Sequence, residues 1–76
     1  MEIYPGITMD PNVRFGKPCL TGTRIDVATV VGALGAGDSQ EEVTDAYQIT
    51  REQVLAALRY AAYVADHLPP AVKRVS

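Results

Sequence analysis

Apolar residues recur in the middle of the chain at intervals of three and four positions, which is the spacing of one face of an α-helix. The repeat begins at Val27, continues through Val30 and Val31, and ends at Leu34. Asp26 precedes it and is predicted to be the N-cap, because its carboxylate can accept a backbone N–H of the first turn. The run Gly35-Ala36-Gly37 should end this helix, since glycine readily adopts left-handed backbone.

Two further helices are predicted from capping boxes, in which a hydroxyl and a side chain three positions later satisfy each other's backbone amides. Ser39 with Glu42 opens the first, and Thr50 with Gln53 opens the second, eleven residues later. The first should end near residues 47–48, and the second should run to about Asp66, before two prolines. Their predicted buried faces are Val43, Ala46 and Tyr47 in the first helix, and Val54, Leu58, Ala61, Ala62 and Ala65 in the second, with Leu55 on the flank.

The N-terminal 26 residues are rich in turn formers and β-branched residues. A short strand over residues 3–8, broken near Pro5-Gly6, and a turn at Asp10-Pro11-Asn12 are expected. The stretch FGKPCLTGTRID, residues 15–26, supplies two glycines and the extended dipeptide Lys17-Pro18. We predict a hairpin flanked by residues 13–16 and 19–23. A phosphate-binding loop fits poorly, because the order GxxxxGK[ST] and its strand–loop–helix frame are absent.

Composition limits the classes of function. A chain of 76 residues forms one domain with a modest core, which favours pairing with a second copy. Cys19 is the only cysteine and His67 the only histidine, so no disulfide or four-ligand zinc site is expected, and no cofactor is implied. No nucleophile–base pair is evident, which argues against an enzyme. A lone thiol, no signal peptide and no long apolar run favour a cytoplasmic protein without a membrane segment.

The two capped helices outline a helix-turn-helix over residues 39–66, with Ile49 at the corner. The net charge is −2, so any basic groups that contact DNA must be local. Many small helical proteins share capped helices around a corner without binding DNA, and acidic residues such as Glu52 would repel phosphate. The predicted DNA contacts are Thr50, Arg51, Gln53 and Arg59 on the reading helix, with Lys17 and Arg24 before it.

A second set of residues is predicted to contact a protein partner. Tyr60, Tyr63 and His67 share one stripe of the last helix with Ala56, and tyrosine is enriched in interfaces. The alternatives are that Ile3 and Tyr4 of the same chain, or of a second copy, cover this stripe. The residues after Leu68 are expected to form a flexible tail whose Val72, Lys73 and Arg74 contact the partner; the alternative is a solvated tail without a role.

The segment from Asp10 to Ala65 resembles domain-of-unknown-function family 433. It carries that family's Asp-Pro, Gly-Lys-Pro, Gly-Thr-Arg-Ile and Ser-x-Glu-Glu elements, at residues 10–11, 16–18, 22–25 and 39–42. The resemblance implies a homeodomain-like helix-turn-helix and an antitoxin role beside a PIN-like ribonuclease toxin. Proline usually follows Gly-Thr-Arg-Ile in that family, whereas this chain has Asp26, a difference expected to change little.

The sequence therefore predicts a mainly α fold: a small helix-turn-helix domain, homeodomain-like or winged-helix-like, with a short N-terminal β-arm or hairpin. The domain should cover residues 1–68, with the arm in 1–26 and three helices in 27–68, followed by the tail 69–76. The expected function is a homodimeric antitoxin that neutralises a PIN-like toxin and binds double-stranded operator DNA. The alternatives are a transcription regulator without a toxin and a dimeric interaction module that does not bind DNA.

Overall fold

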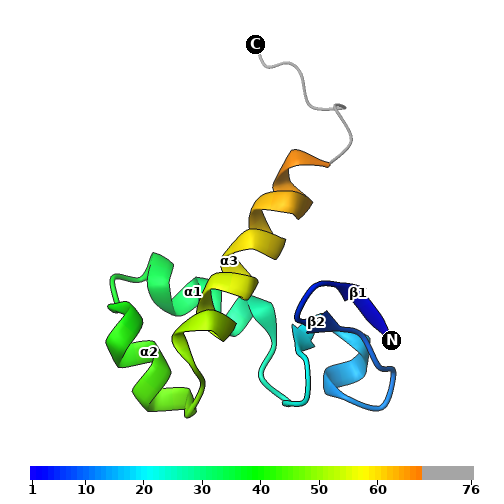
Figure 1. The fold of residues 1–76 in the computed structure, drawn as a ribbon, viewed down its shortest axis with the longest axis horizontal. Helices are drawn as coiled ribbons and strands as arrows, with labels where there is room; N and C mark the ends of the chain where they lie inside the picture. The colour runs from blue at the N-terminus through cyan, green and yellow to red at the C-terminus, as the bar shows by residue number, and fades with distance from the viewer. Residues whose placement is uncertain (68–76) are drawn as a thin grey trace.

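The computed structural model describes residues 1–67 as three helices and a small sheet (Figure 1). The expected mainly helical fold is confirmed. The predicted boundary at residue 68 and the tail 69–76 lie outside the described residues. In chain order the elements are β1 (Glu2–Tyr4), β2 (Ile7–Thr8), the 3-10 turn η1 (Arg14–Gly16), β3 (Cys19–Leu20), α1 (Val27–Gly35), α2 (Gln40–Tyr47) and α3 (Arg51–Asp66).

The sheet is antiparallel, with the strand order β1-β2-β3. β1 and β2 form the expected broken strand as a tight hairpin, whose turn holds Gly6 at a φ of 84°. The predicted second hairpin is wrong. Cys19 and Leu20 pair with Thr8 and Ile7, while residues 14–16 form η1 instead of a strand. The physical reason is burial: Ile7 and Leu20 lie side by side in the sheet, and both have no exposed surface.

The helices begin and end where the local signals predict. The Asp26 side chain accepts a hydrogen bond from the backbone N–H of Thr29 at 3.2 Å and caps α1. Both capping boxes form, one from Ser39 with Glu42 and one from Thr50 with Gln53. These caps depend only on residues three positions apart, so they follow from the sequence without knowledge of the tertiary fold.

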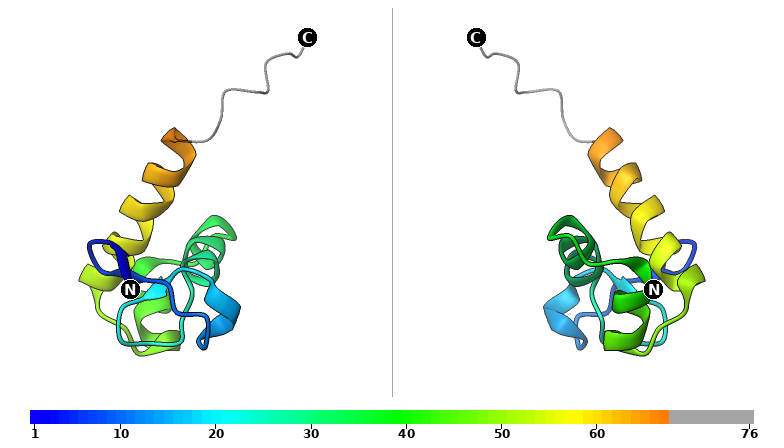
Figure 2. Two further views of the ribbon diagram at one scale, coloured as in Figure 1. Left: turned by 90° about the vertical axis from the view of Figure 1, so that its right-hand side faces the viewer. Right: turned by 90° about the vertical axis from the view of Figure 1, so that its left-hand side faces the viewer.

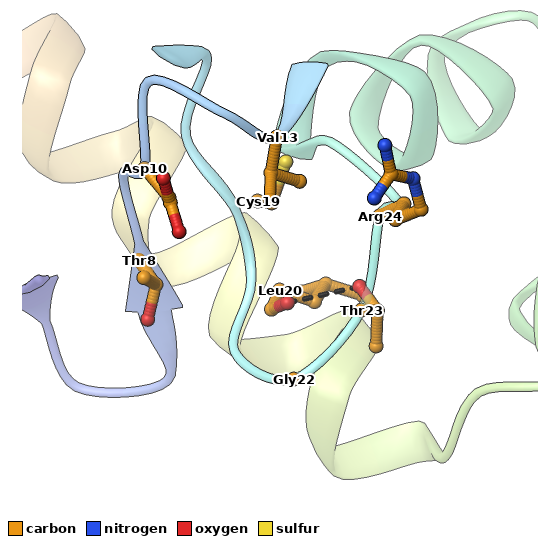
Figure 3. A pocket seen from close by; sticks show the side chains of 8 residues that line it. All are labelled: Thr8, Asp10, Val13, Cys19, Leu20, Gly22, Thr23 and Arg24. Carbon is orange, nitrogen blue, oxygen red and sulfur yellow. Dashed lines mark hydrogen bonds between the residues drawn. The ribbon is translucent and has the colours of Figure 1, made fainter. Parts of the chain in front are cut away.

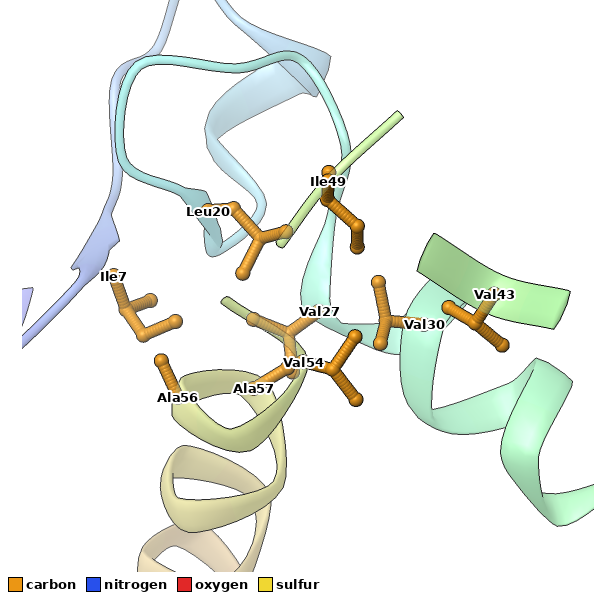
Figure 4. Packing of buried hydrophobic residues seen from close by; sticks show 9 residues of the cluster. All are labelled: Ile7, Leu20, Val27, Val30, Val43, Ile49, Val54, Ala56 and Ala57. Carbon is orange, nitrogen blue, oxygen red and sulfur yellow. The ribbon is translucent and has the colours of Figure 1, made fainter. Parts of the chain in front are cut away.

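A single apolar cluster joins the sheet to the three helices (Figure 4). Val54 of α3 is fully buried, and every element of the sheet and helices except β1 contributes a buried side chain to the cluster. The buried members are Ile7, Leu20, Val27, Val30, Val43, Ile49, Val54, Ala56 and Ala57. Ile49, in the turn between α2 and α3, is 7% exposed, as expected of a residue at that corner.

The buried face of α3 differs from the prediction. Ala56, which was expected on the outer stripe, is buried, whereas Ala62 and Ala65 are exposed. Ala46 of α2 is exposed as well. The hairpin explains the difference in α3, because its turn packs against Ala56 so closely that a Cβ on Gly6 would lie 3.2 Å from the Ala56 Cβ.

The C-terminal half of α3 extends beyond the rest of the described fold (Figures 1 and 2). Its residues from Ala62 to Asp66 are exposed, although they include Tyr63 and Val64. Among the described residues, no helix has both the length and the apolar composition required to cross a membrane.

Replacing Ile49 by alanine tests the corner between α2 and α3. The change removes a buried side chain from the core, so the free energy of unfolding should fall by about 2–4 kcal/mol. Urea unfolding followed by circular dichroism measures this loss. Ile3→Ala is the matched control, because Ile3 is 38% exposed, and it should cost less than about 1 kcal/mol. Equal losses in the two variants would contradict the assigned role of Ile49.

Candidate interaction surfaces

A turn of three residues, 48–50, joins α2 to α3. Gln48 adopts left-handed backbone with a φ of 56° and ends α2, Ile49 enters the core, and Thr50 caps α3. Left-handed backbone at Gln48 turns the chain within one residue, so the second helix begins almost at once. This geometry agrees with the predicted short turn between two capped helices. The helix-turn-helix assignment itself stays a prediction.

The four residues of the α3 segment that are predicted to contact DNA differ in whether their side chains already form hydrogen bonds or ion pairs within the chain. The Gln53 Oε1 accepts a hydrogen bond from the Thr50 N–H at 2.8 Å, and the Thr50 hydroxyl accepts one from the Gln53 N–H at 3.1 Å. Both side chains therefore serve the cap, and Gln53 would have to share its oxygen to pair with adenine. Arg59 forms an exposed ion pair with Glu52 at 3.1 Å. Arg51 is exposed on the first turn.

Lys17 and Arg24 lie on the segment before α1, and each lines a different depression. The Lys17 Nζ is 3.9 Å from the Asp26 carboxylate, at the edge of a groove between α1 and α3. Arg24 lines a hollow of about 370 Å³ beside β3, together with Asp10 and Cys19 (Figure 3). Neither depression includes a residue of the first turn of α3. The six predicted DNA contacts thus come from two segments, α3 and the residues before α1, and Thr21 of the second segment lines a hollow with Gln53 and Arg59.

Asp26 links the residues before α1. Its side chain is 4% exposed, and its carboxylate lies 3.8 Å from the Arg14 guanidinium as well as near Lys17. Hydrogen bonding from Thr29 lowers the pKa of Asp26 below its usual value; Arg14 and Lys17 act in the same direction, and burial opposes them. The Asp26 carboxylate therefore stays ionised. It accepts a hydrogen bond from the backbone N–H of Thr29, and the Arg14 and Lys17 cations lie near it.

Cys19 is a buried thiol beside this carboxylate. It is 3% exposed, and burial, followed by the charge of Asp26, raises the pKa of the thiol. A raised pKa reduces the thiolate fraction, so the side chain acts as a small apolar group and not as a nucleophile.

The tyrosines of α3 form an aromatic cluster with the N-terminal strand. The ring of Tyr4 lies 5.5 Å from that of Tyr60 and 5.1 Å from that of Tyr63, and Tyr63 lies 4.1 Å from His67. Tyr4 of the same chain thus covers part of the stripe, which was one of the alternatives. Tyr63 is still 45% exposed, and His67 is exposed. A partner-binding role for Tyr60, Tyr63 and His67 stays a prediction, and Val72, Lys73 and Arg74 lie outside the described residues.

An open groove of about 500 Å³ runs between α1 and the C-terminal half of α3. We call it the α1–α3 groove. Lys17, Pro18 and Asp26 form its edge, and the rest of its lining is apolar apart from the hydroxyl of Tyr60. The apolar lining includes Val27, Ala28 and Val31 from α1 and Ala61, Val64 and Ala65 from α3.

Sequence reasoning missed Arg14 and Phe15 as candidate surface residues. Both adopt left-handed backbone, with φ values of 51° and 58°, and the Phe15 side chain is 96% exposed. In the predicted hairpin this segment would have been a strand. The one local signal for an unusual turn is Gly16, which has a φ of 82°.

These features define a small protein in which three helices and a short antiparallel sheet share one core. The family model described as "Protein of unknown function (DUF433)" matches residues 7–61. The chain therefore belongs to the DUF433 family, as its motifs predicted.

Two comparisons with Mycobacterium tuberculosis proteins extend this result. The chain is 36% identical over 52 residues to "Putative antitoxin VapB45" of strain ATCC 25618 / H37Rv, a match that covers 68% of this chain and 22% of that relative. It is similar to the X-ray crystal structure of Rv2018, with a TM-score of 0.62 and 36% identity over 68% of this chain and 24% of that one. The chain thus spans less than a quarter of the length of either.

Asp26→Asn tests the buried carboxylate through pH. The folded pKa lies below the ordinary value of 3.8, so the unfolded chain takes up this proton first as the pH falls. Wild-type stability should therefore decline from about that pH downward, through the folded pKa. Asparagine caps a helix as well as aspartate but carries no charge. The variant should be about 1 kcal/mol less stable at neutral pH, where it lacks the charge near Arg14 and Lys17.

Urea unfolding between neutral pH and pH ~3 measures the difference in free energy of unfolding between wild type and variant. Acid destabilises proteins largely by protonating carboxylates that are paired or hydrogen-bonded in the folded state. The gap between wild type and variant should narrow as the medium becomes acidic. A gap that stays constant over the whole range would show that the Asp26 charge does not contribute to stability.

Proposed function

We propose that this chain is an antitoxin, which binds a toxin protein and holds it inactive. The observation that carries the proposal is the 36% identity, over 52 residues of this chain, to a protein named as a putative antitoxin. An antitoxin acts by binding, so the proposed role is regulatory and not enzymatic. We further propose that the toxin is a PIN-like ribonuclease, as the family resemblance implies.

The surface of α3 supports a protein partner. Tyr63 is 45% exposed, on the part of the helix that extends from the fold (Figure 2). Aromatic side chains are enriched where proteins meet, because they bury a large area at low entropic cost. A partner covering this face would also contact His67, which lies against the ring of Tyr63.

Growth rescue tests the antitoxin proposal. The gene next to the one that encodes this chain is expressed from an inducible promoter, alone and together with the chain. Expression of the neighbour alone should stop growth, and co-expression should restore it. Ile49→Ala, which weakens the fold, serves as a control that should rescue less well. If the neighbour is toxic and the chain never restores growth, the proposal is wrong.

The tail is proposed as part of the toxin contact. Val72 and Val75 can fill apolar pockets, while Lys73 and Arg74 can approach the carboxylates that hold a metal ion in a nuclease. Removing residues 69–76 should weaken toxin binding by at least about tenfold, because burial of one valine is worth that much. Dimer formation should not change.

Titration calorimetry of the truncated chain against the purified toxin measures this loss. A second variant, Lys73→Gln with Arg74→Gln, separates the basic side chains from the apolar ones. Unchanged affinity after truncation would remove the tail from the mechanism and leave the helical body as the toxin-facing surface.

DNA binding through α3 is the second part of the proposed function, and it would let the antitoxin regulate its own operon as a homodimer. The support is the pair of capped helices with Ile49 buried at the corner and Arg51 exposed on the first turn of α3. Arginine at such a position can bond to guanine in the major groove. Two copies would place two such helices on one duplex.

Arg51→Ala should weaken operator binding by about 1–3 kcal/mol and relax its sequence preference. Lys17→Ala and Arg24→Ala should instead weaken binding to all sequences alike and reduce its salt dependence. Fluorescence anisotropy with a duplex from the promoter region and a scrambled duplex measures both effects. Gln53→Glu is a useful comparison, because it preserves the capping box while removing the amide donors.

Operator affinity that is unaltered in both Arg51→Ala and the double variant Arg51→Ala with Gln53→Ala would show that α3 is not the reading helix. If the wild-type chain binds neither duplex, the protein is an interaction module that does not bind DNA. A chain that binds the operator and no toxin would be a transcription regulator.

A further inference from the structure

Phe15 is the most exposed large apolar residue among residues 1–67, with 96% of its surface accessible. It stands on η1 with a φ of 58° and a ψ of 32°, and Arg14 before it has a φ of 51°. Two successive non-glycine residues in left-handed backbone are uncommon. Such conformations persist where the surroundings fix them, and they gather at functional sites.

Hydrogen bonds on both sides of Phe15 fix this conformation. The Gly16 N–H donates to the Val13 carbonyl at 3.0 Å, and the Lys17 N–H donates to the Arg14 carbonyl at 3.1 Å. The Arg14 and Lys17 side chains also lie close to the Asp26 carboxylate, at 3.8 and 3.9 Å. The loop therefore holds the ring of Phe15 away from the body as a preorganised knob, which we call the Phe15 knob (residues 14–16).

The α1–α3 groove begins immediately after this knob. Lys17 and Pro18, the next two residues, form its edge together with Asp26, which pairs with Arg14. No charged residue occurs from Val27 to Gly37 or from Tyr60 to Ala65, so both walls of the groove come from uncharged segments. The charged residues of the lining are Lys17 and Asp26, whose charged groups already lie 3.9 Å apart. A second chain could cover the rest of the lining without removing another charge from water, which would otherwise be costly.

We propose that this chain forms a twofold dimer in which Phe15 of each copy inserts into the α1–α3 groove of the other. This rests on the homodimer of the proposed function and assigns its interface. The loop that carries Phe15 adjoins the groove, because Lys17 lines the groove and Arg14 pairs with Asp26 of its lining. A twofold axis makes such a surface self-complementary, and the contact closes after two copies.

The size of the interface is consistent with a stable pair. An aromatic side chain buries about 150–250 Å², so two knobs contribute roughly 300–500 Å². Stable interfaces bury about 1,200–2,000 Å² in total. The remainder comes from the facing surfaces of α1 and α3, where Val64 is 38% exposed and Ala28 and Ala65 are exposed. The two rings alone supply roughly 300–500 Å², so most of the area of a stable pair has to come from these helix surfaces.

Two substitutions separate the knob from the groove. Phe15→Asn removes the ring while keeping a residue that tolerates left-handed backbone. Ala61→Arg places a long charged side chain in the groove, and Ala62→Arg is its matched control on the neighbouring exposed position outside the groove. Phe15→Asn and Ala61→Arg should each raise the dimer dissociation constant roughly hundredfold, because every dimer loses two buried rings. Ala62→Arg should leave it unchanged.

A fluorescent reporter tests the insertion directly. The chain contains no tryptophan, so Phe15→Trp introduces a unique indole fluorophore. Its emission should shift to shorter wavelength as the concentration rises and the dimer forms, and this shift should be absent when Ala61→Arg is added. Analytical ultracentrifugation on the same samples gives the dissociation constant.

Each contrary result shows which part of the proposed dimer is wrong. A wild-type chain that stays monomeric at high micromolar concentration would overturn this proposal and the homodimer, while toxin binding is measured separately. A Phe15→Asn dimer as stable as wild type, or a Phe15→Trp variant whose emission stays that of an exposed indole, would overturn the knob-in-groove contact alone. If Ala61→Arg weakened toxin binding and left the dimer intact, the groove would belong to the toxin and this proposal would be wrong.

Discussion

The buried carboxylate of Asp26 is the interaction on which the arrangement of the sheet and the helices depends. It caps α1 through the backbone of Thr29, its backbone forms a bridge with Cys19 at the end of β3, and its charge faces Arg14 and Lys17. A buried charge is costly unless it is paired and hydrogen-bonded, and here it is both. Proline, which is usual at this position in the family, would provide neither the side-chain cap nor the charge.

The consequences of this contact reach the candidate surfaces. Because Asp26 fixes both the start of α1 and the loop that carries Phe15, the loop and the α1–α3 groove share an edge. Two further exposed apolar residues, Tyr63 and Val64, lie on the extended half of α3. The chain thus has a small buried core and exposed apolar residues outside it, and exposed apolar patches mark sites where proteins bind one another.

The sequence predicted the helices well because their signals are local. The caps at Asp26, Ser39 and Thr50 each involve residues three positions apart, and all three form. The sheet was harder, since the pairing of β3 with β2 depends on burying Leu20 beside Ile7 across many intervening residues. No local pattern distinguishes that pairing from a hairpin with residues 13–16.

The sites were predicted less completely for the same reason. Alanine recurs along α3, so its pattern could not show that Ala56 faces the sheet while Ala62 faces outward. The exposure of Phe15 depends on left-handed backbone that its residue type does not favour, and the one local signal of an unusual turn was the neighbouring Gly16.

The central claim is that this member of the DUF433 family inactivates a partner protein by binding it. The most direct measurement is the ribonuclease activity of the purified product of the neighbouring gene, titrated with this chain. The account predicts that cleavage of an RNA substrate falls in proportion to added chain and stops at a fixed stoichiometric ratio. Full cleavage in the presence of excess folded chain would contradict it.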